Sequence, residues 1–135
     1  MKKFITTIAM AVTAMTLFVG CGAPASLEEA VAKDKDAQEQ INQMAEDSGV
    51  SVEIKENALI YTYDLGMELD EDTKAAVVEQ LDAGISSYDS TFVGIAKTLE
   101  DETKVSGITV IVNYTDSNGD VVYSATFNST ERVTE

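Results

Sequence analysis

Residues 50–65 read VSVEIKENALIYTYDL, and apolar and polar side chains alternate along them on both sides of Glu56-Asn57. Alternation with a period of two indicates a β-strand with one buried face. A two-residue turn at Glu56-Asn57 places the apolar residues of both strands on the same face, so this stretch predicts a β-hairpin of defined register. The expected facing pairs are Val50 with Tyr63, Val52 with Tyr61, and Ile54 with Leu59.

A second alternating segment begins at Ile108 and continues to Phe127. Asn118-Gly119 interrupts it, and this dipeptide is the strongest short hairpin signal in the chain. A two-residue turn centred there predicts three facing pairs: Tyr114 with Tyr123, Val112 with Ala125, and Val110 with Phe127. The remaining residues, 129–135, are interpreted as a polar, frayed tail.

Helical sequence precedes each hairpin. Ser26-Leu27-Glu28-Glu29 is a capping box, in which the serine oxygen accepts a backbone N–H and Glu29 reaches back to the serine N–H. Asp36-Ala37-Gln38-Glu39 offers a second box, so we expect a short helix and then a longer one to Asp47, closed by Ser48-Gly49. The longer helix is expected to turn three residues toward the core: Ile41, Met44 and Ala45.

A long helix is expected over residues 68–102. Its apolar residues step by three and four positions, which indicates one continuous stripe. Such a stripe also occurs at a coiled-coil seam, but a helix lying on a sheet is the preferred interpretation. Gly84 lies off the stripe, so a bend is expected near residues 84–87. The stripe consists of Val78, Leu81, Ile85, Tyr88, Phe92, Ile95 and Leu99.

The order helix, hairpin, helix, hairpin predicts an α+β fold with a four-stranded antiparallel sheet and the helices packed on one face. The opposite face of that sheet is rich in hydroxyl side chains. Its first interpretation is a solvated surface, and its second is a docking surface. The residues expected there are Ser51, Glu53, Lys55, Ile60, Thr62, Thr109, Ile111, Asn113, Val122, Ser124 and Thr126.

The start of the chain has the pattern of a bacterial lipoprotein export signal. Lys2 and Lys3 precede an apolar run, residues 4–19, which is shorter than the roughly 20 apolar residues of a stable membrane span. Leu17-Phe18-Val19-Gly20-Cys21 resembles the lipobox, although phenylalanine stands where leucine is usual three positions before the cysteine. This resemblance implies a diacylglyceryl anchor on Cys21 and attachment to the membrane through that lipid.

These patterns predict three regions: a lipoprotein signal peptide over residues 1–20, a short linker over 21–25, and a single α+β domain over 26–135. The alternative is an ordinary secreted protein that is cut near Ala23 or Ala25 and loses Cys21. An internal disulfide is excluded in either case, because Cys21 is the only cysteine. The domain must therefore rely on its hydrophobic core.

The charge of the chain is strongly acidic, with 24 Asp and Glu residues against nine Lys and Arg residues. Lys2 and Lys3 precede Cys21, whereas all the acidic residues follow it, so the mature net charge is 7 − 24 = −17. Such a charge argues against nucleic acid and anionic lipid headgroups as direct partners.

Composition also excludes most catalytic chemistry. Without any histidine, neither a Ser-His-Asp triad, a Cys-His pair nor a histidine-ligated metal can form within this chain. Because the lone cysteine is assigned to lipid, thiol nucleophiles and zinc–cysteine sites are excluded as well. We predict no catalytic residues, no cofactor and no metal site.

Two acidic segments invite comparison with calcium sites. Residues 116–120, DSNGD, resemble the start of an EF-hand loop, which requires glycine at its sixth position and glutamate at its twelfth. Val121 and Phe127 stand there, so a hairpin turn is preferred. A second cluster is expected to cap the following helix rather than to gather calcium. This cluster consists of Glu68, Asp70, Glu71 and Asp72.

Four segments of the mature chain carry a resemblance to a known family. They are Ser26-Leu27-Glu28-Glu29, residues 48–57 leading to Ile60-Tyr61-Thr62-Tyr63, Asp70-Glu71-Asp72, and Val110-Ile111-Val112-Asn113-Tyr114. With them the chain resembles small lipoproteins of gut-dwelling Firmicutes that contain domain-of-unknown-function family 4854. The resemblance implies a Gram-positive cell-surface lipoprotein, and it implies no activity, substrate or site residue.

The function expected from these features is that of a non-catalytic binding or interaction module at the bacterial envelope, with an envelope protein or peptide as its partner. One alternative is a peptidase inhibitor or peptide binder that uses a sheet edge, since antiparallel sheets accept added strands. Two further alternatives are an enzyme of unfamiliar type and cation buffering by the acidic surface.

Overall fold

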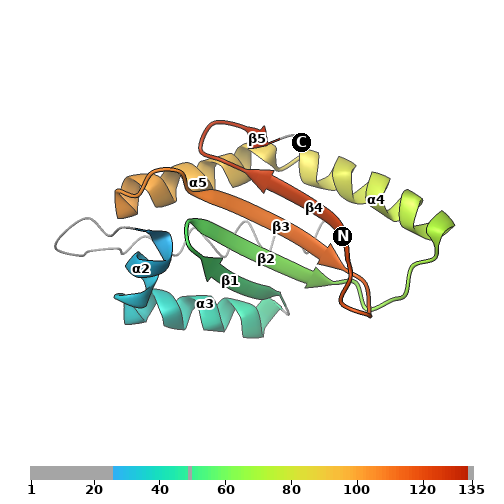
Figure 1. The fold of residues 1–135 in the computed structure, drawn as a ribbon, viewed down its shortest axis with the longest axis horizontal. Coiled ribbons are helices and arrows are strands. Elements are labelled where there is room, and N and C mark those ends of the chain that lie inside the picture. The colour runs from blue at the N-terminus through green and yellow to red at the C-terminus, as the bar shows by residue number, and fades with distance from the viewer. Residues whose placement is uncertain (1–25, 49, 134–135) are drawn as a thin grey trace.

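The computed structural model describes residues 26–48 and 50–133, so the leader, Cys21, the 21–25 linker, Gly49 and the side chains of Met44, Asp47 and Ser48 lie outside the described residues. Within this part of the chain, helices and hairpins alternate as expected, which confirms the α+β class (Figure 1). The elements are α2 (Leu27–Ala32), α3 (Lys35–Ser48), β1 (Ser51–Lys55), β2 (Ala58–Asp64), α4 (Glu71–Ser86), α5 (Asp89–Thr103), β3 (Thr109–Thr115), β4 (Val121–Phe127) and β5 (Arg132–Val133).

The first predicted hairpin has the predicted register. β1 and β2 pair antiparallel, with Val52 opposite Tyr61 and Ile54 opposite Leu59. Lys55 lies opposite Ala58, so Glu56-Asn57 is the two-residue turn, and Glu56 has a φ of 55°. Two hydrogen bonds attach this turn to the start of α2: the Glu28 N–H donates to the Glu56 carbonyl, and the Glu56 N–H donates to the Glu28 carboxylate, each at 2.8 Å.

The second hairpin has the three predicted pairs, but its two-residue turn at Asn118-Gly119 is wrong. The register shifts after Tyr114, and Thr115 lies opposite Val121, so a five-residue loop joins β3 to β4. The cause is Asp116, whose Oδ1 accepts the N–H groups of Asn118 at 2.9 Å and Asp120 at 3.0 Å. This Asx turn satisfies the backbone donors that a tighter turn would have used.

The sheet has five strands in the order β1-β2-β3-β4-β5, and its central pair, β2 and β3, is parallel. The predicted four-stranded antiparallel sheet is therefore wrong. α4 and α5 run in succession back along the sheet from the end of β2 to the start of β3 (Figure 1). One passage of helix along the sheet returns the chain to the end of the sheet at which β2 began, so β3 must run in the same direction as β2.

Residues 129–133 do not form the frayed tail that their polarity suggested, and residues 134–135 lie outside the described residues. Arg132 and Val133 form β5 and pair antiparallel with Phe127 and Thr126 of β4. The turn before β5 is closed by Asn128, whose N–H donates to the Glu131 carbonyl and whose Oδ1 accepts the Glu131 N–H at 2.7 Å.

The two N-terminal helices appear as predicted, with one change in capping. Ser26 Oγ accepts the Glu29 N–H at 3.1 Å, which confirms the serine cap of α2. The start of α3 is capped by Asp34 rather than by Asp36: its Oδ1 accepts the Asp36 N–H at 3.0 Å and the Ala37 N–H at 3.2 Å. Of the residues predicted to face the core, Ile41 is buried and Ala45 is half-buried.

The long helix is divided into two, and it begins at Glu71 rather than Glu68. The division lies directly after the predicted bend. Ser86 and Ser87 donate their hydroxyls to the carbonyls four residues earlier, at 2.7 and 3.4 Å, a contact that commonly bends helices. Most of the predicted stripe is nevertheless buried: Leu81, Ile85, Phe92, Ile95 and Leu99.

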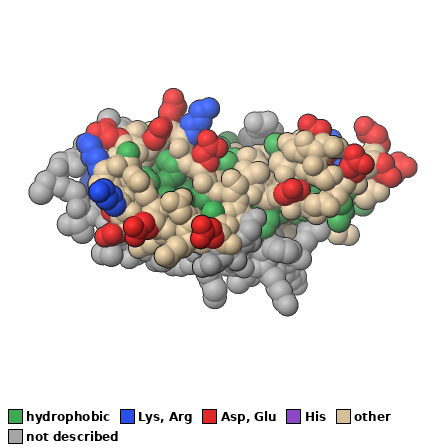
Figure 2. All heavy atoms as spheres, turned by 90° about the horizontal axis from the view of Figure 1, so that it is seen from below, with side chains coloured by type: hydrophobic (Ala, Val, Ile, Leu, Met, Phe, Trp, Pro, Cys, Tyr) green, Lys and Arg blue, Asp and Glu red, His purple; other side chains and the backbone are tan. Residues whose placement is uncertain are grey.

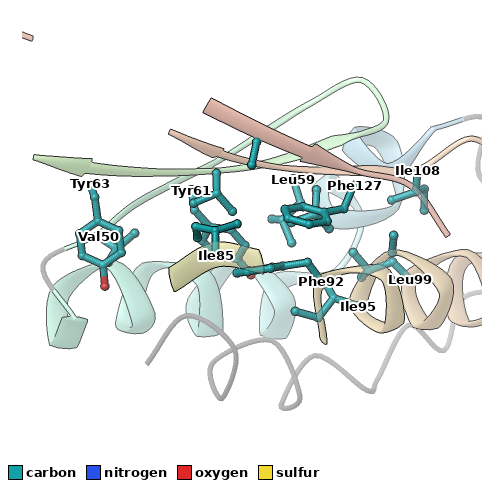
Figure 3. Close-up of a cluster of buried hydrophobic side chains, with 14 of the residues drawn as sticks. Val50, Leu59, Tyr61, Tyr63, Ile85, Phe92, Ile95, Leu99, Ile108 and Phe127 are labelled. Carbon is teal, nitrogen blue, oxygen red and sulfur yellow. The ribbon is translucent and has the colours of Figure 1, made fainter. Parts of the chain in front are cut away.

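The core lies between one face of the sheet and the helices. In Figure 3, Leu59, Tyr61 and Phe127 extend from the sheet and meet Ile85, Phe92 and Leu99 from the helices below it. The rings of Phe92 and Phe127 stack with centroids 4.9 Å apart. Buried residues alternate with less buried ones along β2 and along β3 up to Tyr114, so the helices cover one face of the sheet, as predicted.

Candidate interaction surface

The other face of the sheet, which we call the outer face, is not covered by any described helix. The side chains predicted to lie there alternate with buried core residues, as a one-sided sheet requires. On the three long strands they are half-buried or exposed and carry no charge. These residues are Ile60, Thr62, Thr109, Ile111, Asn113, Val122, Ser124 and Thr126, and Ala58, which was not predicted there, joins them at the start of β2.

The strand registers arrange the outer face in rows that cross the sheet. Ile60 of β2 lies beside Ile111 of β3, which lies opposite Thr126 of β4, which in turn pairs with Val133 of β5. Val133 is 40% exposed. From β2 to β5 this row therefore consists of β-branched side chains, of which all but Thr126 are apolar, and on β1 it ends at Glu53, which lies opposite Ile60.

The neighbouring row is polar but neutral. It runs through Thr62, Asn113 and Ser124, which occupy adjacent positions on β2, β3 and β4. Ser124 donates its hydroxyl to Asn113 Oδ1 at 2.7 Å, so these two side chains are held in one orientation across the strands. A neutral surface of this size contrasts with the rest of a chain that has 24 acidic residues.

Charged residues lie at the margins of the outer face. Glu53 and Lys55 are exposed on β1, and Asp64 is exposed at the end of β2. Figure 2 looks onto the side of the molecule where α3 and β1 lie. Asp and Glu side chains are spread along this side and gather at its right-hand end, where α4 begins.

The two edges of the sheet differ. β5 covers the β4 edge only at its end, where it pairs with Thr126 and Phe127, whereas β1 has a described strand on one side along its whole length. β5 is held by Arg132, whose Nη2 lies 2.5 Å from Asp82 Oδ1 and 2.6 Å from the Tyr123 hydroxyl. Arg132 Nη1 donates to Ser86 Oγ at 3.0 Å and lies 3.6 Å from Asp89 Oδ1.

Arg132 and the side chains around it form what we call the Arg132 cluster, and two members of this cluster have shifted pKa values. The hydrogen bond from Arg132, together with one from Tyr123, lowers the pKa of Asp82. Burial and the hydrogen bond to Asp82 raise the pKa of Tyr123 to about 12. Sequence reasoning missed the cluster, because its members are scattered over residues 82–132 and share no pattern; the one available signal is that Arg132 is the only arginine.

The acidic segments serve as caps and turns. Asp70 is the N-cap of α4, and its Oδ1 accepts the Thr73 N–H at 2.7 Å, which lowers the pKa of Asp70. Glu68 accepts a hydrogen bond from the Asn118 side chain at 3.1 Å. Within residues 26–48 and 50–133, no three His, Cys, Asp or Glu side chains are grouped so that they could hold a metal ion.

The buried tyrosines offer no reactive phenolate. Burial raises the pKa of Tyr61 and of Tyr114, so both phenols stay protonated at ordinary pH. The Tyr61 hydroxyl is buried without a hydrogen-bond partner among the described residues, and Tyr63 and Tyr114 stack with ring centroids 5.3 Å apart. These residues contribute to packing within the core.

The comparison with family models decides the relationship that the sequence suggested. Residues 27–127 match the model of a domain of unknown function, DUF4854, which spans α2 to β4. The chain belongs to the DUF4854 family. No curated protein matches the chain, and no solved structure matches it.

The DUF4854 match contains the complete outer face up to β4 and the β1 edge, beside which no further strand is described. β5 and Arg132 lie beyond the matched residues, so the short strand that pairs with the end of β4 is outside the matched domain. Among the helices described here, none is both long and apolar enough to cross a membrane. The candidate interaction surface of this DUF4854 domain is thus a neutral sheet face beside the β1 edge, which has a described strand on one side only.

Proposed function

We propose that this DUF4854 protein is a non-catalytic binding module at the outer surface of a Gram-positive cell membrane, held there by a diacylglyceryl group on Cys21. The leader pattern supports the anchor: two lysines, a short apolar run and a lipobox-like sequence ending in the cysteine. Two acyl chains anchor a protein firmly, whereas a single chain is marginal.

The outer face supports binding of a protein partner. In a chain of net charge −15, nine neighbouring face positions on β2, β3 and β4 are neutral, and Ile60 and Ile111 adjoin at its centre. Exposed apolar patches rimmed by polar residues are typical of protein–protein interfaces. The neutrality of this face is the observation that carries the proposal, because a merely solvated face would have shared the acidic character of the rest.

The anchor is tested by fractionation and mass spectrometry of the native protein. The wild type is expected in the membrane fraction, with an acylated cysteine as its first residue. Cys21→Ala is expected to lose both the acyl group and membrane retention that withstands high salt. A wild-type protein that is recovered unacylated, with an N-terminus after Cys21, would contradict the anchor.

The docking face is tested by site-specific photo-crosslinking in intact cells. A photoreactive residue at Ser124, which is exposed on the outer face, is compared with one at Ala76, which is exposed on α4. Discrete crosslinked products are expected from position 124, and they should be reduced by Thr62→Lys on the same face. Identical products from both positions, or none from position 124, would contradict docking on this face.

A further inference from the structure

We infer that the partner contributes an extended, cationic peptide segment, which pairs with the β1 edge as an added strand. This inference rests on the proposed binding function and names the chemistry of the part that binds. Its first support is the difference between the two sheet edges. β5, held by Arg132, covers the end of the β4 edge at Thr126 and Phe127, whereas all five residues of β1 have a described strand on one side only. Long open edges are ready templates for strand addition.

The β1 edge is held rigidly enough to act as a template. Its turn is attached to α2 by the paired hydrogen bonds between Glu28 and Glu56, and the Leu27 N–H donates to Asn57 Oδ1 at 3.1 Å. On the other side of the turn, the Thr109 N–H donates to the Asn57 carbonyl at 2.9 Å, which joins the turn to β3. A preformed edge avoids much of the ordering cost of binding.

The side chains beside this edge suit alternate residues of an added strand. Val52 and Ile54 point to the core side of β1 and are only half-buried, although they pack against the core. α3 lies beside β1 on that same side of the sheet (Figures 1 and 3). In Figure 2, which looks onto this edge, apolar side chains show between the acidic ones. Alternate apolar residues of a peptide would cover Val52 and Ile54 and lie over α3.

The charge around the edge selects a cationic segment. Residues 26–64, which form α2, α3, β1 and β2, contain ten acidic and three basic residues, a net charge of 3 − 10 = −7. β1 itself exposes one acidic and one basic residue, Glu53 and Lys55, so the negative charge comes from its surroundings. The adjoining turn has Glu56, and α3 exposes Asp36, Glu39 and Glu46. A second copy of this acidic chain would be repelled at this edge, whereas Lys or Arg residues alternating with apolar ones complement it.

The test uses the acylated mature protein in neutral detergent and a synthetic peptide that alternates valine and lysine. Binding is followed by fluorescence anisotropy of the labelled peptide, and amide hydrogen exchange locates the site. We expect saturable binding that weakens with added salt, protection of β1 amides, and no binding of the matched valine–glutamate peptide. Binding without protection at Ser51–Lys55, or no binding of the lysine peptide, would overturn the inference.

Two controls separate strand pairing from general attraction to an acidic protein. N-methylation of every second peptide residue, made in both registers, is expected to weaken binding at least about tenfold in one register, because an added strand presents alternate N–H groups to the edge. Glu53→Lys should weaken binding about fivefold more than Glu79→Lys, an exposed α4 variant with the same change in net charge. Equal effects in either comparison would overturn strand pairing.

The outcome also distinguishes this inference from the proposed function. If the peptide does not bind at β1 while crosslinks from position 124 persist in cells, the proposed binding function stands and the inference about the β1 edge is wrong. If the crosslinks are absent while the peptide binds at β1 with the expected controls, the edge is a peptide site and docking on the outer face is wrong.

Discussion

Arg132 provides the sharpest test of the structure, because one side chain holds β5 against the rest of the domain. Arg132→Gln removes the ion pair with Asp82, the hydrogen bonds to Tyr123 and Ser86, and a guanidinium 5.9 Å from the Phe127 ring centroid. Asp82 is half exposed, so the ion pair contributes about 0.5 kcal/mol. The two hydrogen bonds, partly open to solvent, contribute about 0.5 kcal/mol each.

The expected loss for Arg132→Gln is therefore about 1.5 kcal/mol in the free energy of unfolding, or roughly 5 °C in Tm for a domain of this size. Urea unfolding at pH 7 measures it, and amide exchange should show that β5 and the adjoining part of β4 lose protection first. Lys97→Gln, exposed on α5, removes the same charge and should change stability by less than about 0.5 kcal/mol. Equal losses in the two variants, or unchanged exchange in β5, would refute the role of Arg132 as the residue that holds this strand.

Four other substitutions test the core, the orphaned hydroxyl, the capping and the pH dependence. Phe127→Ala, which removes a fully buried ring stacked on Phe92, should cost about 3–5 kcal/mol in chemical denaturation. Tyr61→Phe should raise stability by about 1 kcal/mol in the same assay, because it removes a buried hydroxyl that has no partner among the described residues. Lys104→Gly should raise the Tm, with a gain of about 0.5–1 kcal/mol, because Lys104 caps α5 at a φ of 60°. Asp82→Asn should be less stable than the wild type at pH 7, and this difference in unfolding free energy should shrink as the pH falls below about 4. The reason is that the hydrogen bonds that lower the pKa of Asp82 stabilise the folded state only while the carboxylate is charged. A difference that stays constant from pH 7 to about pH 2.5 would contradict this prediction.

The hairpin registers could be predicted from sequence because each strand has one apolar face and the period is two. A slip of one residue would have turned Phe127 to the opposite face of the sheet from Val110 and Val112, so the alternation excluded that register. The turn signal at Asn118-Gly119 then selected the pairs Val112–Ala125 and Val110–Phe127. The same alternation identified the outer-face residues. The contrast between the outer face and its acidic surroundings depends on the pairing of β2 with β3, because that pairing brings Ile60 beside Ile111.

The strand order could not be predicted from pattern, because alternation is the same for parallel and antiparallel strands. What decides it is the number of helical traverses between β2 and β3, and one bent traverse gives a parallel pair. Arg132 and β5 could not be predicted for a different reason. The residues that bind Arg132, which are Asp82 and Tyr123, are polar and separated in sequence, so they produce no hydrophobic periodicity. Two local details differ from the prediction because side-chain oxygens accept backbone N–H groups. Asp34 caps α3 in place of Asp36, and Asp116 organises a five-residue loop in place of the two-residue turn.

The topology itself explains why the outer face needs a functional interpretation. α2 and α3 pack near β1, while α4 and α5 pack near β3 and β4, and all lie on the core side, so the described helices leave the other face bare. Sheets with a bare face normally make it polar and charged, and purely parallel strands are rarely left uncovered. Here the central pair is parallel, its outer side chains are Ile60 and Ile111 with flanking threonines, and the acidic residues lie at the margins. If that face were only solvated, Ile60→Lys together with Ile111→Glu would leave crosslinking from position 124 unchanged in cells; if it docks a partner, the double variant should abolish the crosslinks while the domain still unfolds cooperatively.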